Sequence, residues 1–225
     1  MVLNHNNCGF LFDLDGVLID THDLHWDAWQ EMRDIRPDLS HLTYTDFKNG
    51  FGKSNESFLL TVVPTTDPEK RKALGKEKET LFRKRASGKI SFLPGVEQFL
   101  QQIQKAKIPM IIASSSSIAN MEFYLSETVI GLYFSTYVSA EHVPHGKPAP
   151  DIFIEAAHRI EVPIKSCFVL EDSLAGLEAA RASKAQVIAL ATTYTVKELK
   201  VHKALFDFLL APEELDLSLF YPLPD

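Results

Sequence analysis

The sequence predicts an α/β fold in which a parallel, Rossmann-like sheet carries helices on both faces and an all-helical cap domain is inserted. Short apolar runs recur along the 225 residues, and most are followed by a helical pattern. Continuous apolar runs of this length are typical of strands buried on both faces. Strands that alternate with helices favour a parallel sheet covered on both sides. The stretch from 20 to 90 breaks this alternation because it contains no convincing strand.

The expected core elements follow this alternation in chain order. The strands are expected at Gly9–Asp15, Ile108–Ala113, Thr136–Ser139, Ser166–Leu170, Ala185–Leu190 and Phe206–Leu210, of which the third is the weakest run. The helices are expected at Val96–Lys107, Ile118–Thr128, Pro150–Ile160, Leu174–Ser183 and Val196–Lys203. Each expected helix follows or precedes a buried strand, as a doubly covered parallel sheet requires.

The interrupting stretch is expected to be entirely helical. Its helices are expected at Leu24–Arg33, Asn55–Val62 and Glu69–Arg85, and most charges of the last are interpreted as a solvated face. An insertion directly after the first strand suggests a cap over the carboxyl end of the sheet, where ligands bind in open α/β sheets. With hinges near Ile19–Thr21 and Ile90–Gly95, the expected domains are a core of 1–19 and 91–225 and a cap of 20–90.

Composition limits the classes of partner. The formal net charge is −7, which gives no electrostatic reason to bind nucleic acid or an anionic membrane. An anionic substrate would need a local positive site, which a bound metal ion could supply. No apolar run approaches the ~20 residues of a membrane span, and the N-terminus lacks a leader pattern. The two cysteines, Cys8 and Cys167, are expected to be free thiols in a reducing cytoplasm.

Two acidic clusters lie at expected strand ends. Asp13 and Asp15 end the first strand on the same side of the chain, and Gly16 then allows a sharp turn. Spacing alone leaves open whether these are metal ligands or turn-capping aspartates. Glu171 and Asp172 end a later strand and should meet the first pair at the same edge, although Asp172 or Ser173 could instead cap a helix. The repeated pattern favours Mg²⁺, a hard cation that binds carboxylate oxygens.

Two further segments could bind an anion. Ser114 and Ser115 begin a run of four serines between an expected strand and helix, where hydroxyl and backbone N–H groups can form an anion site. Such a run is also common as a plain loop and helix cap. Lys147 stands between Gly146 and Pro148 on a rigid turn, where its charge could balance four acids and a phosphate.

These four segments, in this order, resemble the motifs of the haloacid dehalogenase superfamily of phosphohydrolases. The chain is similar above all to the beta-phosphoglucomutase-like branch, through FDLDGVLIDT, GKPAPDIF and LEDSLAGLEAA. The resemblance implies that Asp13 is a nucleophile that forms an aspartyl-phosphate and that Asp15 is the general acid and base. It further implies that Asp13, the Asp15 backbone carbonyl and Asp172 bind Mg²⁺, with Glu171 close by. Ser114, Ser115 and Lys147 would hold the phosphoryl group.

The cap residues bear on the choice between a phosphatase and a mutase. By resemblance, His25 and Lys78 occupy the places of a histidine and a lysine that assist the mutase, while a cap–core seam histidine and a solvated lysine stay open as alternatives. The mutase's cap arginine is missing, and Lys53 could replace it only as a point charge. The mutase's asparagine after the second motif corresponds to Ile118. These two differences favour a phosphatase.

The sequence thus predicts a cytoplasmic, Mg²⁺-dependent phosphatase that hydrolyses a small phosphorylated metabolite and works as a monomer. The cap residues expected near the substrate are His25, Gly52, Lys53, Ser54, Asn55 and Lys78. The first alternative is a beta-phosphoglucomutase-type sugar phosphomutase. The second is a non-catalytic phosphate-ligand sensor on the same fold, which would be expected to lack the nucleophile or the second acid.

Overall fold

The computed structural model describes residues 8–221, so the expectation about a leader pattern lies largely outside the described residues. Its six strands form one parallel sheet in the order β3-β2-β1-β4-β5-β6. The strands are β1 (Gly9–Phe12), β2 (Met110–Ser114), β3 (Tyr137–Ser139), β4 (Cys167–Glu171), β5 (Gln186–Leu190) and β6 (Phe208–Leu210). Every strand lies within three residues of its predicted bounds, and the predicted parallel α/β fold is confirmed.

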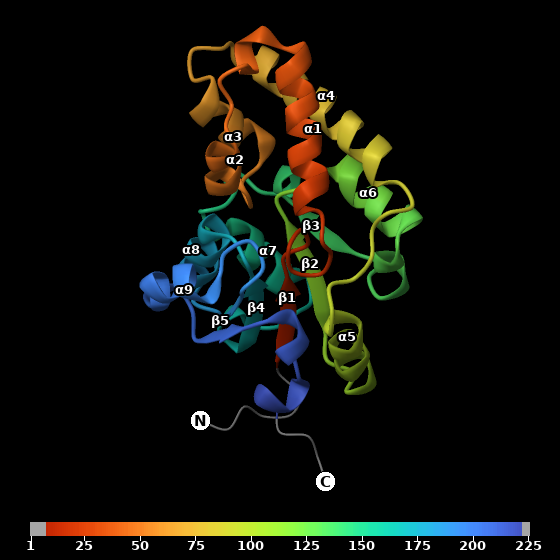
Figure 1. Ribbon diagram of the computed structural model, residues 1–225. Helices are drawn as coiled ribbons and strands as arrows, with labels where there is room; N and C mark the ends of the chain where they lie inside the picture. The colour runs from red at the N-terminus through yellow and green to blue at the C-terminus, as the bar shows by residue number, and fades with distance from the viewer. Residues whose placement is uncertain (1–7, 222–225) are drawn as a thin grey trace.

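The sheet buries both of its faces, and alternation along β1 shows this directly. Phe10 and Phe12 belong to one apolar cluster, whereas Leu11 belongs to the other. The helices α5 (Val96–Lys105) and α6 (Ile118–Glu127) cover the first face. The other face is covered by α7 (Asp151–Arg159), α8 (Leu174–Ser183) and α9 (Val196–Leu199). The two layers enclose the sheet, as Figure 1 shows.

Short 3₁₀ helices complete the fold. One of them, Lys200–Leu205, replaces the last turn of the helix that was predicted to run to Lys203, because His202 leaves helical geometry. The others are Pro37–Leu39, Val129–Leu132, Ala140–His142, Ile164–Ser166, Pro212–Glu214 and Leu217–Leu219. In the described part of the chain no helix is long and apolar enough to cross a bilayer. Cys8 and Cys167 are buried free thiols, as predicted.

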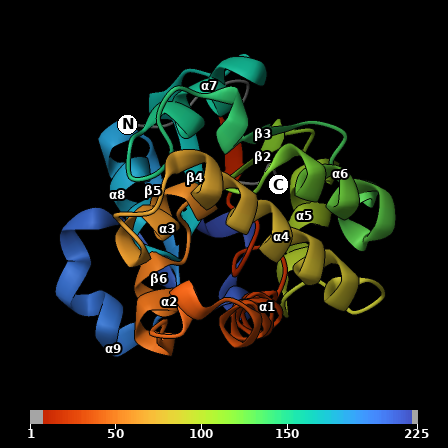
Figure 2. The same ribbon diagram turned by 90° about the horizontal axis from the view of Figure 1, so that it is seen from above.

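Four helices, which we call the cap helices, stand above the carboxyl ends of the strands (Figures 1 and 2). They are α1 (His22–Ile35), α2 (Tyr44–Gly50), α3 (Asn55–Val62) and α4 (Pro68–Ala86). They enclose an apolar cluster of their own, which includes Trp29, Phe47 and Phe58. The prediction omitted α2, although Thr43 and Asp46 form a capping box at its start, a pattern that the sequence displays.

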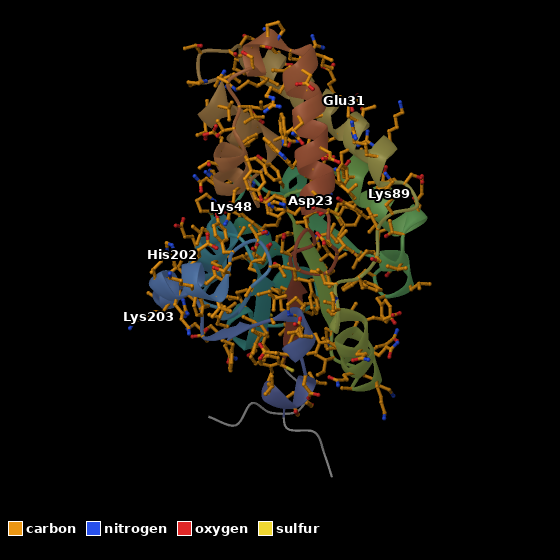
Figure 3. All side chains as sticks on the ribbon, in the orientation of Figure 1. Asp23, Glu31, Lys48, Lys89, His202 and Lys203 are labelled. Atoms are coloured by element: carbon orange, nitrogen blue, oxygen red, sulfur yellow. The ribbon has the colours of Figure 1, made fainter. Side chains whose placement is uncertain are left out.

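Two chain crossings join the cap helices to the core. Ile19 and Phe92 form an isolated antiparallel bridge, and the backbone N–H of Leu93 donates to the Leu18 carbonyl at 3.0 Å. The two predicted hinge segments therefore lie side by side, although the domain boundaries at 20 and 90 stay a prediction. A separate contact joins the cap to the core at Lys48, which Figure 3 labels. The Lys48 ammonium lies 2.8 Å from the Glu198 carboxylate.

Candidate active site

A pocket lies between the cap helices and the carboxyl edge of the sheet. The core contributes Asp13, Asp15 and the serines from Ser114 to Ser117. The cap contributes Gly50, Gly52, the aromatic side chains Trp29, Phe47, Phe51 and Phe58, and the polar side chains His25, Lys53, Asn55, Lys78 and Glu79. The core side of the pocket, which we call its floor, therefore carries acids and hydroxyl groups. The cap side, which we call its roof, carries aromatic and charged side chains.

A buried ion pair lies under the floor. Asp13 follows β1, and its Oδ1 accepts a hydrogen bond from the Lys147 Nζ at 2.6 Å. The same ammonium donates to Glu171 Oε1 at 2.5 Å, and neither Lys147 nor Glu171 has any exposed side chain. Burial alone lowers the pKa of Lys147, but the two carboxylates reverse this and raise the pKa above its usual value. Lys147 is therefore a fixed positive charge against Asp13.

A third carboxylate leaves the cluster with excess negative charge. The oxygens of Asp13, Glu171 and Asp172 can lie within 4.8 Å of one another, and all three residues are buried. Burial and then the Glu171 charge raise the pKa of Asp172 to about 7. Three acids against one ammonium therefore repel one another in a buried site, and a divalent cation would relieve that repulsion.

The carboxylate oxygens of Glu171 and Asp172 differ in the hydrogen bonds that they accept. Both Glu171 oxygens already accept hydrogen bonds, Oε1 from Lys147 and Oε2 from the backbone N–H groups of Asp172 and Ser173. Asp172 Oδ2 accepts from the Thr193 hydroxyl, but its buried Oδ1 has no hydrogen-bond partner within residues 8–221. A buried acceptor without a partner is costly, so Asp172 Oδ1 fits a metal ligand.

The local backbone fits the same interpretation. Ser173 caps α8 by accepting from the Gly176 N–H, so the alternative that Asp172 is the helix cap is wrong. Gly16 has a φ of +84°, and a Cβ there would lie 2.1 Å from Asp172 Oδ2. Only glycine lets the turn after β1 pass this close to Asp172. The residues present thus fit Mg²⁺, with Asp13 and Asp172 as side-chain ligands and Glu171 holding Lys147.

Asp15 accepts hydrogen bonds from both parts of the molecule. Its Oδ1 accepts from the hydroxyls of Thr21 at 2.6 Å and Tyr124 at 2.9 Å, and His25 Nε2 lies 3.4 Å away. Its Oδ2 accepts from the Ser116 hydroxyl at 3.0 Å. Burial raises the pKa of Asp15, but the bonds from His25, Thr21 and Tyr124 outweigh burial and hold the pKa well below its usual range. Asp15 is therefore held as an anion.

The serines of the run make different contacts. Ser114 is buried at the pocket floor, and its Oγ accepts from the Ser116 N–H at 3.1 Å. Ser115 donates from its hydroxyl to the Gly52 carbonyl at 2.7 Å and so ties the core to the cap. Ser117 caps α6 by accepting from the Asn120 N–H. The helix-cap interpretation therefore holds for Ser117, although it lines the pocket together with Ser114, Ser115 and Ser116.

A series of buried polar contacts connects the cap to Asp15. His25 is stacked on Phe82 at 3.9 Å between ring centroids, and its Nδ1 accepts from the Lys78 Nζ at 2.6 Å. Lys78 is 2% exposed, so the alternative of a solvated lysine is wrong. Its ammonium also lies 2.8 Å from Glu79 Oε1. Because Nδ1 accepts, the His25 proton resides on Nε2, the atom that faces Asp15.

The remaining predicted cap residues lie on the loop before α3. Gly52, Lys53 and Asn55 line the pocket. Ser54 instead caps α3, because its Oγ accepts from the Ser57 N–H, and it is not among the side chains that line the pocket in the described part of the chain. Ser54 thus shapes the loop, and its neighbours reach the ligand space.

Sequence reasoning did not single out four residues that build the site. These are Glu79, Ser116, Asn120 and Tyr124. Ser116 stood inside the serine run, and Glu79 followed the noted Lys78, so both had a signal. Asn120 and Tyr124 lie on α6, where nothing in the spacing distinguishes a pocket residue from a core residue.

A sequence model of haloacid dehalogenase-like hydrolases matches residues 9–184. The chain is 30% identical over 178 residues to the fructose-1-phosphate phosphatase YqaB of Escherichia coli K12, which covers 78% of this chain and 92% of that protein. It is 32% identical over 214 residues to a beta-phosphoglucomutase of Mycobacterium bovis, with 79% and 78% covered. These relatives include both a phosphatase and a mutase.

Solved structures agree with this relationship. A family IA, variant 3 hydrolase from Entamoeba histolytica superposes with a TM-score of 0.84 at 27% identity. The match covers 94% of this chain and 96% of that one. The likeness therefore includes the cap helices as well as the sheet.

Proposed function

Because the chain belongs to the haloacid dehalogenase-like hydrolases, we propose that it is a Mg²⁺-dependent phosphatase that hydrolyses a small phosphate monoester, such as a sugar phosphate. The observation that carries the proposal is the buried cluster of three acids around one lysine, directly under a pocket. Such a cluster costs stability unless it serves a cation and an anionic ligand together. Phosphoryl transfer needs both.

Asp13 would act as the nucleophile on the phosphorus. Its carboxylate lines the pocket, and Lys147 fixes one oxygen and supplies positive charge beside the transferred group. Ser114 ends β2 at the pocket floor, where its hydroxyl can donate to a phosphoryl oxygen, whereas the hydroxyl of Ser115, the next residue, already donates to the Gly52 carbonyl. Mg²⁺ held by Asp13 and Asp172 would neutralise charge on the phosphoryl oxygens. Positioning and charge stabilisation supply most of the rate in such reactions.

Asp15 would act in the proton transfers of the reaction. An aspartyl-phosphate splits one displacement into two, and the second step needs a base for the attacking water. Asp15 is held in its unprotonated form by Thr21, Tyr124, Ser116 and the cap residue His25, so it is available as that base, and losing one of these donors would raise its proton affinity. Because one of these donors comes from the cap, a change in cap position would alter the proton affinity of Asp15.

The mutase stays the alternative function. A mutase must hold a second phosphate on its substrate, and the described residues in the roof of this pocket include Lys53 but no arginine. Ile118, at the place of the mutase's asparagine, begins α6 through its backbone and offers no polar side chain. A sensor without turnover is disfavoured because both Asp13 and Asp15 are present and face the pocket.

The deciding experiment measures phosphate release from p-nitrophenyl phosphate and from a panel of sugar phosphates, phosphoglycolate, nucleotides and pyrophosphate, with and without Mg²⁺. We expect Mg²⁺-dependent hydrolysis and little interconversion of β-glucose 1-phosphate and glucose 6-phosphate. Efficient interconversion with a bisphosphate activator would establish the mutase instead. Ligand binding without turnover on the whole panel would favour the sensor.

Gly52→Ala should lower kcat/KM by about tenfold or more, because the cap loop could no longer approach the core. Gly52 has a φ of +83°, and a Cβ there would lie 2.0 Å from Ser173 Oγ. Gly88→Ala is the matched control, since Gly88 has a φ of +71° but no atom of the described chain lies within 4 Å of the added Cβ. Both variants carry about 1–2 kcal/mol of left-handed backbone strain, so only the close approach separates them. Equal kinetics in the two variants would contradict the argument.

A further inference from the structure

One buried carboxylate in the pocket has no part in the reaction described above. Glu79 lies on α4, is 7% exposed, and lines the same pocket as Asp13 and the serine run. Burial raises the pKa of Glu79, but Lys78, His25 and Asn55 outweigh it and lower the pKa to about 2. Glu79 is therefore an anion near neutral pH, and it forms an ion pair with Lys78 in the roof of the pocket.

Three elements hold this carboxylate in one position. Oε1 accepts from the Asn55 amide at 2.5 Å and from the Lys78 Nζ at 2.8 Å. Oε2 accepts from the Asn120 amide at 2.5 Å, and the Asn120 carbonyl in turn accepts from Arg83 at 2.6 Å. A carboxylate has about four lone-pair sites, so one site on Oε2 remains for a ligand donor. Glu79 is therefore a rigid acceptor with one open position.

The same contacts remove positive charge from the roof. Lys78 is paired with Glu79 and donates to His25, so its ammonium is already neutralised and bonded. Among the described residues that line the pocket, Lys53 is then the one cation without such a partner on the roof. An ionised second phosphate that entered beside Glu79 would have no proton to donate to Oε2 and would place its negative oxygens against this carboxylate oxygen. A sugar hydroxyl there would instead donate to Oε2.

We propose that Glu79 is a specificity residue that selects sugar or polyol monophosphates and excludes bisphosphates, because the uncharged end of the substrate must lie against its carboxylate. The inference rests on the proposed function, since it assigns the substrate class of the same pocket. It also gives a physical reason for the weakness of the mutase alternative, whose substrate cycle requires a second phosphate. Specificity of this kind comes from a repulsive element as well as from attractive ones.

The test compares the binding of fructose 1-phosphate and fructose 1,6-bisphosphate by calorimetry, in the presence of Mg²⁺, to the Asp13→Asn protein with and without Glu79→Gln. With Glu79 intact, we expect the monophosphate to bind at least about tenfold more tightly than the bisphosphate. In Glu79→Gln, which also frees the Lys78 charge, this preference should fall at least about tenfold. Binding is measured without turnover, so failure of the proposed phosphatase activity shows only in the kinetics of the unsubstituted enzyme.

Glu77→Gln is the matched control. Glu77 is on the same helix, but it pairs with Arg36 at 2.6 Å and lies outside the pocket, so its removal should leave the preference unchanged. Equal affinities for the two compounds with Glu79 intact, or no binding of either, would overturn the proposal. So would a loss of affinity in Glu79→Gln that is the same for both, because that result indicates a purely structural role. If Glu79→Gln does not fold, the preference with Glu79 intact still decides.

Discussion

Asp13→Asn should reduce kcat for phosphate release by about 10⁴-fold or more, because the amide cannot attack phosphorus. Asp13 is the one acid of the buried cluster that both faces the pocket and is fixed by Lys147. The measurement is the initial rate with p-nitrophenyl phosphate at saturating Mg²⁺. Retention of more than about one per cent of the activity would refute the role of Asp13 as the nucleophile.

The same substitution should leave the protein folded. The Asn Oδ1 can still accept from Lys147, and the change removes one negative charge from a cluster that has three acids for one ammonium. We therefore expect the Tm without Mg²⁺ to be unchanged or higher. Asp23→Asn is the control, because Asp23 is 98% exposed at the start of α1 and lies outside the pocket (Figure 3). Its activity should stay near that of the unsubstituted enzyme.

The strands could be predicted from sequence because each is a continuous apolar run with both faces buried. The run of Phe10, Leu11 and Phe12 needs no partner to be recognised, and the sheet places its residues alternately on the two faces. The cap was harder. The charges of α4 concealed Glu79, and only the family resemblance singled out Lys78. The burial of both depends on packing against α1, α3 and α6 rather than on any period in α4 itself.

The residues of the site also differ in whether the sequence could predict them. Asp13, Ser114, Lys147 and Asp172 each follow a strand end or stand on a tight turn, so position in the chain indicates position at the sheet edge. Tyr124 reaches Asp15 from the middle of α6, across 109 residues of sequence. Such a contact is decided by how α6 packs on the sheet, and no local pattern encodes it.

Lys147→Met should cost about 3–5 kcal/mol of folding free energy in the absence of Mg²⁺, in addition to abolishing activity. Lys147 is fully buried, and its ammonium lies 2.6 Å from Asp13 and 2.5 Å from Glu171. Methionine fills much of the same volume, so the loss reflects two buried carboxylates without their shared cation rather than a cavity. Urea unfolding of both proteins measures the difference, and Lys203→Met, at an exposed position, should be nearly neutral.

The change in Tm on adding Mg²⁺ is a second measurement on Lys147→Met. With Lys147 absent, the remaining acids crowd one site with no counter-charge, so a cation bound by Asp13 and Asp172 has more repulsion to relieve. The rise in Tm on adding MgCl₂ should therefore be larger for Lys147→Met than for the unsubstituted protein, even though activity does not return. Activity stays lost because Mg²⁺ cannot replace the donor that holds Asp13 Oδ1. An equal rise in both proteins would mean that Lys147 and the metal do not share the charge of this cluster.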